Sequence, residues 1–97
     1  MVINKINFKE CEELLKELAE DVIKLKILQD WLESINVNLA ELEAELNLGK
    51  LSKKIYRQFK INLEKEKRIS EAKVKSTKEK ILANLKKVNK ILSESKV

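Results

Sequence analysis

The stretch Leu46-Asn-Leu-Gly-Lys-Leu-Ser52 stands at the middle of this 97-residue chain and contains its only glycine, Gly49. Glycine most readily adopts the left-handed backbone conformation that ends a helix, and serine is a favoured residue at the start of the next one. The chain has no proline, and arms of equal length flank Gly49. The sequence therefore predicts a helix, a turn from Asn47 to Ser52, and a second helix that runs back along the first.

The first arm carries the apolar repeat of a coiled coil. Asn7 and Glu10 have the spacing of a capping box, which predicts a helix that begins at Phe8. Apolar residues then recur at alternating steps of three and four, with one short step that divides the repeat into two sets. The first set is Cys11, Leu15, Leu18, Val22 and Leu25, and the second is Leu28, Leu32, Ile35, Leu39, Leu42 and Leu46.

The second arm has an uneven apolar pattern. The turn is followed by an apolar cluster of Ile55, Tyr56, Phe59 and Leu63, expected to pack on the end of the first arm. Residues 64–80 are mostly polar, and in a hairpin of equal arms they stand opposite the most apolar part of the first arm. A capping-box spacing at Ser76 and Glu79 then precedes a stripe formed by Ile81, Leu85, Val88 and Leu92.

These patterns predict an all-α chain of one domain, an antiparallel two-helix coiled-coil hairpin with helices over about residues 8–46 and 52–93. The capping-box spacing leaves an alternative open. In that alternative the second arm bends between Ser70 and Thr77, and its last part completes a three-helix bundle.

Charge is divided unequally between the two arms. Residues 1–49 contain eleven acidic residues and five lysines, whereas residues 50–97 contain five acidic residues and sixteen lysines or arginines. An antiparallel hairpin lays the acidic arm along the basic one, and such pairing sets which helix faces which more than it adds stability.

The middle of the first arm is more apolar than one helix-pair seam requires. This excess predicts either a core position in the three-helix arrangement or an interface with a second copy or another protein. A homodimer, in which each copy covers the other, and a place in a larger complex both satisfy the second expectation. The candidate interface residues are Leu18, Val22, Leu25, Leu28, Trp31, Leu32 and Ile35.

The residue inventory argues against catalysis. Histidine, the usual general base and a common metal ligand, is absent, and a single glycine cannot build a phosphate-binding loop. No cofactor or metal is expected. The one cysteine, Cys11, and the lack of an apolar run long enough to span a bilayer predict a cytoplasmic protein without a membrane span.

A second hypothesis rests on the basic arm. Lysines are dense over residues 73–90, and such density can hold nucleic-acid phosphates without sequence preference. The candidate contacts are Lys73, Lys75, Lys78, Lys80, Lys86, Lys87 and Lys90. The sequence thus predicts a non-catalytic structural or adaptor module, with a nucleic-acid-associated accessory protein as the alternative.

Overall fold

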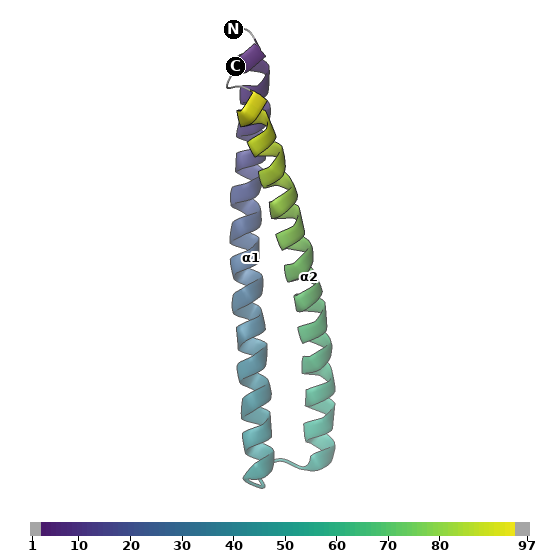
Figure 1. Ribbon diagram of the computed structural model, residues 1–97. Helices are drawn as coiled ribbons and strands as arrows, with labels where there is room; N and C mark the ends of the chain where they lie inside the picture. Colours follow the sequence, from purple (N-terminus) through teal and green to yellow (C-terminus); the bar gives the residue numbers. More distant parts are fainter. Residues whose placement is uncertain (1–2, 95–97) are drawn as a thin grey trace. The chain divides into compact units, whose positions relative to one another are not determined.

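The computed structural model describes the backbone of residues 3–94 and the side chains of residues 9–94. It contains two long helices packed against each other, α1 (Ile3–Asn47) and α2 (Lys53–Glu94), joined by a short turn (Figure 1). No strand occurs among these residues. The chain is therefore an all-α helical hairpin, as predicted.

The turn between the helices is fixed by backbone hydrogen bonds. Gly49 has a φ of +74°, and its amide donates to the carbonyl of Leu46 at 3.0 Å, while the amide of Lys50 donates to that of Glu45 at 3.0 Å. This pair of bonds is a Schellman motif, which satisfies carbonyls that the end of α1 would leave unpaired. Ser52 then caps α2, because its Oγ accepts from the amide of Ile55 at 3.3 Å.

Two details of the helices differ from the sequence prediction. Helix α1 begins at Ile3 and not at Phe8, so Asn7 lies inside the helix and does not cap it. Helix α2 runs unbroken through residues 70–77, which excludes the three-helix alternative. The physical reason is that neither segment contains glycine or proline, and Thr77 packs as a buried residue within a continuous helix.

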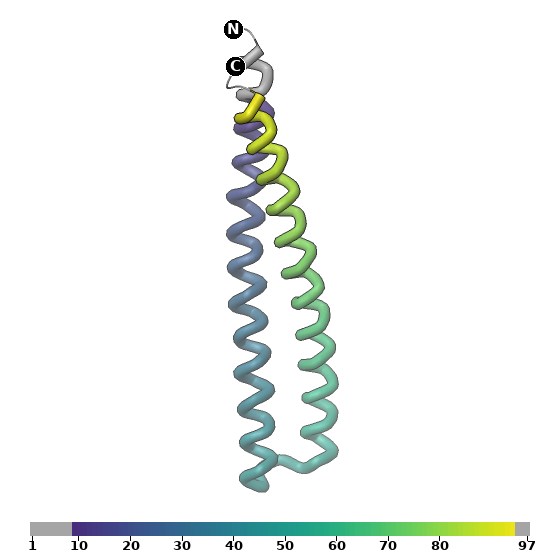
Figure 2. Tube along the Cα trace, viewed as in Figure 1, coloured from purple at the N-terminus to yellow at the C-terminus, as the bar shows by residue number. Residues whose placement is uncertain are grey.

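The hairpin packs as two compact units, which Figure 2 locates by residue colour along the Cα trace. The first unit combines Met1–Lys26 with Lys75–Val97, of which residues 3–26 and 75–94 are described. The second unit is Ile27–Val74 and contains the turn. Each unit takes part of α1 and part of α2.

An uninterrupted heptad repeat defines the inner face of α1, the face that packs against α2. This face is called here the α1 seam, and the facing side of α2 is the α2 seam. The buried and half-buried members of the α1 seam are Cys11, Leu14, Leu18, Asp21, Leu25, Leu28, Leu32, Ile35, Leu39, Leu42 and Leu46. The sequence prediction assigned Leu15 and Val22 to this seam and required a short step after Leu25. That assignment is wrong, because Leu14 and Asp21 occupy those positions and the alternation of threes and fours never breaks.

Helix α2 follows the same spacing. Its buried and half-buried seam residues are Tyr56, Leu63, Lys67, Ser70, Val74, Thr77, Ile81, Asn84, Val88 and Ile91. Asn84 and Ile91 replace the predicted Leu85 and Leu92, both of which are exposed. Near the turn, Tyr56 and Leu63 pack inward as expected, whereas Ile55 and Phe59 remain exposed.

The two units differ in how deeply their seams are buried. The first unit buries Leu18, Val88 and Ile91. In the second unit Ile35, at 2% exposure, is the one apolar side chain that is fully buried, and most other seam residues are half-buried. A pair of helices can enclose only one narrow stripe, so apolar residues on any other face stay in contact with solvent.

Candidate protein-interaction surfaces

One ion pair identifies the two edges of the first unit. The Nζ atom of Lys80 lies 3.1 Å from Oε1 of Glu17 and 3.6 Å from Oδ1 of Asp21. Glu17 and Lys80 each immediately precede a seam residue of their helix. In an antiparallel pair such positions share one edge, and the positions that immediately follow a seam residue share the other. The first of these two edges is called here the charged edge.

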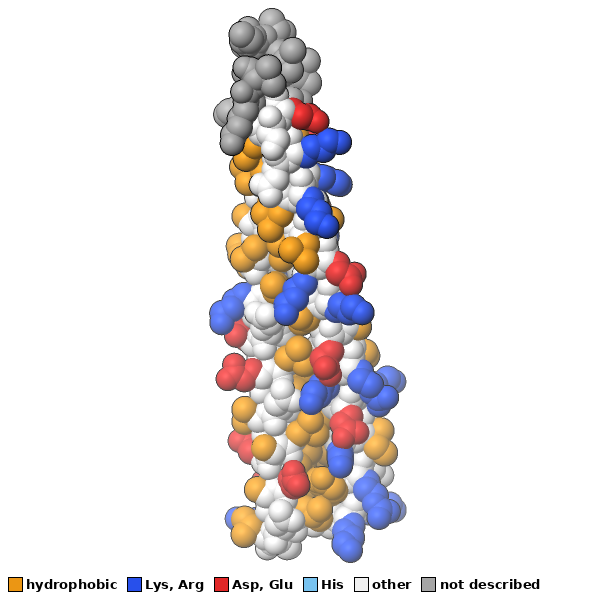
Figure 3. Space-filling view, in the orientation of Figure 1, with side chains coloured by type: hydrophobic (Ala, Val, Ile, Leu, Met, Phe, Trp, Pro, Cys, Tyr) orange, Lys and Arg blue, Asp and Glu red, His pale blue; other side chains and the backbone are white. Residues whose placement is uncertain are grey.

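The other edge of the first unit is apolar. Six apolar residues each follow a seam residue directly, namely Leu15, Ala19, Val22, Leu82, Leu85 and Leu92. These six residues are called here the apolar edge. Its four leucines and Val22 are each 42–58% exposed. In the upper part of Figure 3, orange side chains gather to one side and lysines to the other, in keeping with this division.

The charged edge balances opposite charges across the two helices. Its α1 side carries four glutamates and one lysine, Glu10, Glu13, Glu17, Glu20 and Lys24, and its α2 side carries Lys80, Lys87 and Lys90. Glu10, Lys87, Lys90 and Glu94 line one shallow hollow together. The Glu17 carboxylate, followed by that of Asp21, raises the pKa of Lys80 above its usual value of 10.5.

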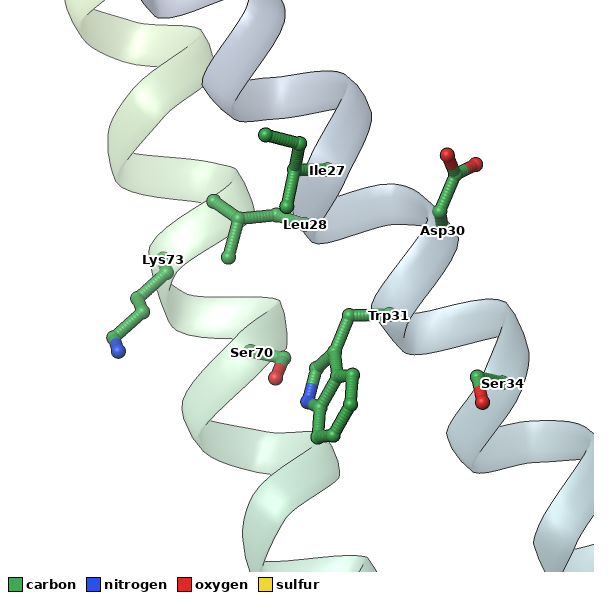
Figure 4. Close-up of a pocket in the computed structure, with 7 residues that line it drawn as sticks. All are labelled: Ile27, Leu28, Asp30, Trp31, Ser34, Ser70 and Lys73. Atoms are coloured by element: carbon green, nitrogen blue, oxygen red, sulfur yellow. The ribbon is translucent and has the colours of Figure 1, made fainter.

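A groove opens on the second unit beside Trp31. It has a volume of about 450 Å³ and is lined by Ile27, Leu28, Asp30, Trp31, Ser34, Ser70 and Lys73. Figure 4 shows the Trp31 ring extending from α1 toward Ser70 on α2. Ser70 is only 4% exposed although it is small, whereas Trp31 keeps 52% of its surface exposed. The Trp31 ring thus shields the small side chain of Ser70 in the α2 seam, and about half of the Trp31 surface remains exposed to solvent.

The structure divides the seven residues of the predicted interface. Leu18 and Ile35 are buried, and Leu25, Leu28 and Leu32 are half-buried, all within the seams of the hairpin itself. Val22 and Trp31 are exposed, Val22 on the apolar edge of the first unit and Trp31 beside the groove of the second. Only these two have half of their surface available for another molecule.

The seven predicted phosphate-contacting lysines are all exposed, but they do not form one track. Lys73, Lys80, Lys87 and Lys90 precede seam positions, Lys75 and Lys78 follow seam positions, and Lys86 lies on the outward face. Lys80 is already paired with Glu17 and Asp21. Lys87 and Lys90 share their hollow with glutamates, which weakens the attraction of this edge for phosphate.

The sequence prediction missed four buried polar side chains, Asp21, Ser70, Thr77 and Asn84. Asp21 and Asn84 lie in the seams of the first unit, and neither Asp21 Oδ2 nor Asn84 Nδ2 has a hydrogen-bond partner among the described residues. Polar residues at seam positions lower stability but fix the register of coiled coils. Extending the heptad from Leu46 back to Cys11 in strict threes and fours would have found Asp21.

The described side chains include no group of histidine, cysteine and carboxylate residues that could hold a metal ion. Cys11 is a free thiol, half-buried in the α1 seam. Over the residues described, neither helix is long and apolar enough to cross a bilayer. Comparison with protein-family models, with curated proteins and with solved structures finds no match.

Proposed function

We propose that this protein is a non-catalytic structural or adaptor module that associates through the apolar edge of its first unit. One observation carries the proposal. In a chain of which 38% of residues are charged, six apolar side chains follow one another along this edge without a charged side chain between them on either helix. Isolated exposed leucines are ordinary on protein surfaces, but an ordered row on two helices is typical of an interaction site.

The size of the edge supports association. Half-exposed side chains of this number present on the order of 500 Å² of apolar surface, which matches the largest patches on monomeric proteins, about 300–600 Å², and such patches are often functional sites. Covering such a patch removes it from water and favours a complex. The partner is a second copy of the chain or another subunit of a larger complex, in the cytoplasm, where Cys11 would stay reduced.

The association is tested by the native size of the chain in an extract of its own cells. The tagged chain is expected to migrate as a larger species in gel filtration and sedimentation. Val22→Lys combined with Leu85→Lys should reduce that size, because each change places a charge on the apolar edge. The matched control combines Val37→Lys with Ile61→Lys, two exposed apolar residues of the second unit. A native size unaffected by the first pair contradicts the proposal.

The lysine density over residues 73–90 supports a second candidate function, a nucleic-acid-associated accessory protein that contacts phosphates without sequence preference. Labelled duplex and single-stranded oligonucleotides are titrated with the chain at two salt concentrations. Binding that weakens steeply with salt, and that is lost in Lys86→Glu/Lys87→Glu/Lys90→Glu, would favour this function. Absence of binding at low salt, where electrostatic contacts are strongest, would reject it.

A further inference from the structure

We propose that the apolar edge of the first unit pairs with the same edge of a second copy, antiparallel, across a twofold axis that passes close to Ala19. The result is a four-helix assembly of two hairpins. This inference rests on the proposed function and adds the identity of the partner and the residue at the centre of the contact.

The first observation is the order of residues along the α1 side of the edge. Glu12, Leu15, Ala19, Val22 and Lys26 recur at steps of three, four, three and four, so they form one straight stripe beside the seam. The stripe reads acidic, apolar, small, apolar, basic. The side-chain sizes are nearly symmetric about Ala19, with a large apolar residue on each side of it. The charges at the two ends of the stripe are opposite in sign.

A twofold axis makes two copies of this stripe complementary to each other in charge and in side-chain size. When two such stripes pair antiparallel about Ala19, Glu12 of each copy lies level with Lys26 of the other, and Leu15 lies near Val22. The favourable charge pair therefore occurs twice. A parallel pair would instead place Glu12 against Glu12 and Lys26 against Lys26, which is repulsive at both ends. The small side chain of Ala19 lets the two α1 helices approach at the axis.

On the α2 side of the edge, the basic residues lie at the same end as on the α1 side. Lys75 and Lys78 lie on the stripe that continues through Leu82, Leu85, Asn89 and Leu92, and over the described residues up to 94 no further charged residue follows them on it. Both helices thus place basic residues at the end of the edge that carries Lys26, and Glu12 marks the other end. Antiparallel pairing brings the basic end of each copy beside the Glu12 end of the other.

The charge pair is tested by exchange. Glu12→Lys and Lys26→Glu are each expected to weaken self-association of the purified chain about tenfold, since each replaces two attractive contacts by two repulsive ones. The double variant Glu12→Lys/Lys26→Glu should recover most of the loss. These residues lie fourteen apart on one helix, about 21 Å along its axis, so they cannot pair within a chain. Failure of the double variant to recover would overturn the antiparallel pairing.

The axis is tested by a cysteine that meets its own copy. In a chain carrying Cys11→Ser, Ala19→Cys is expected to form an intermolecular disulfide readily under mild oxidation. The matched control is Ala83→Cys, because Ala83 is an exposed alanine on the charged edge of the same unit. Circular dichroism verifies that both variants retain their helices. Disulfide formation by neither variant, or equally by both, would overturn an axis at Ala19.

Sedimentation of the purified chain separates this inference from the proposed function. A monomer at all concentrations, together with a large native species in the cell extract that requires the apolar edge, would mean that the partner is a different protein. The proposed function would then stand and the self-pairing would be wrong. A monomer in both measurements would refute both.

Discussion

Gly49 ends α1 in a backbone conformation that side-chain-bearing residues rarely adopt. Its φ is +74°, and a Cβ atom added there would meet nothing within 4 Å. The cost of Gly49→Ala is therefore conformational and not steric, and we expect it to lower the free energy of unfolding by about 1 kcal/mol.

Denaturant unfolding of Gly49→Ala, followed by circular dichroism, measures this loss. Gly49→Asn serves as the control, because asparagine tolerates the left-handed region better and should lose less. Equal stability of the alanine variant and the original chain would show that the turn does not depend on the Schellman geometry.

Lys80 links folding to pH through its two carboxylate neighbours. Because the folded state raises the pKa of Lys80 above 10.5, its stabilising contribution is complete below that pH. The contribution is lost as the pH rises through the higher folded-state pKa. The pH at which it declines therefore lies in the alkaline range, and no effect of Lys80 on the pH dependence is expected near neutrality.

We expect the stability difference between the original chain and Lys80→Met to be constant near neutral pH and to shrink above pH 10.5. Thermal unfolding at a series of pH values measures it. Lys86→Met, on an outward face of the same helix, provides the background for general loss of positive charge. A difference that instead grows with pH would contradict the assigned ion pair.

At the scale of the helices, the heptad register distinguishes leucines that look alike in the sequence. Leu18 is buried in the α1 seam, whereas Leu15 is 52% exposed on the apolar edge. Leu18→Ala should lower the free energy of unfolding by about 2–5 kcal/mol, because it removes buried contacts and leaves a cavity. Leu15→Ala should cost less than about 1 kcal/mol in the dissociated chain.

Chemical denaturation at low protein concentration compares these two variants, since dilution separates any assembly. Similar losses from both would place Leu15 in the seam and restore the interrupted register that the sequence suggested.

Some of this register could be predicted, and the reason for the rest is physical. Capping chemistry identified the turn, and apolar spacing identified most of the α1 seam. Hydrophobicity favoured Val22 over Asp21, since burying a carboxylate is costly. The cost is offset here by Lys80, on the facing helix, and no pattern within α1 reports that contact. The change of register also changed the candidate interaction site. Residues that the sequence prediction had placed in the seam, such as Leu15 and Val22, lie instead on the surface.

At the scale of the whole molecule, the proposed self-association would make stability depend on protein concentration. If two hairpins cover each other, the folded dimer is favoured by mass action, and the thermal midpoint rises with protein concentration. We expect this rise for the original chain and its absence in Val22→Lys, which places a charge close to the proposed axis. Differential scanning calorimetry over a hundredfold range of concentration measures both. A midpoint that never changes would mark the purified chain as a monomer.

The shared heptad spacing of both helices also restricts how such a chain can change in length over evolution. Removing one whole heptad from each arm keeps every remaining seam residue on the inner face and keeps the arms equal. A deletion in one arm alone leaves part of the other without a neighbour, and a partial heptad rotates the faces beyond it. We therefore expect viable insertions and deletions to come as matched heptads on the two sides of Gly49.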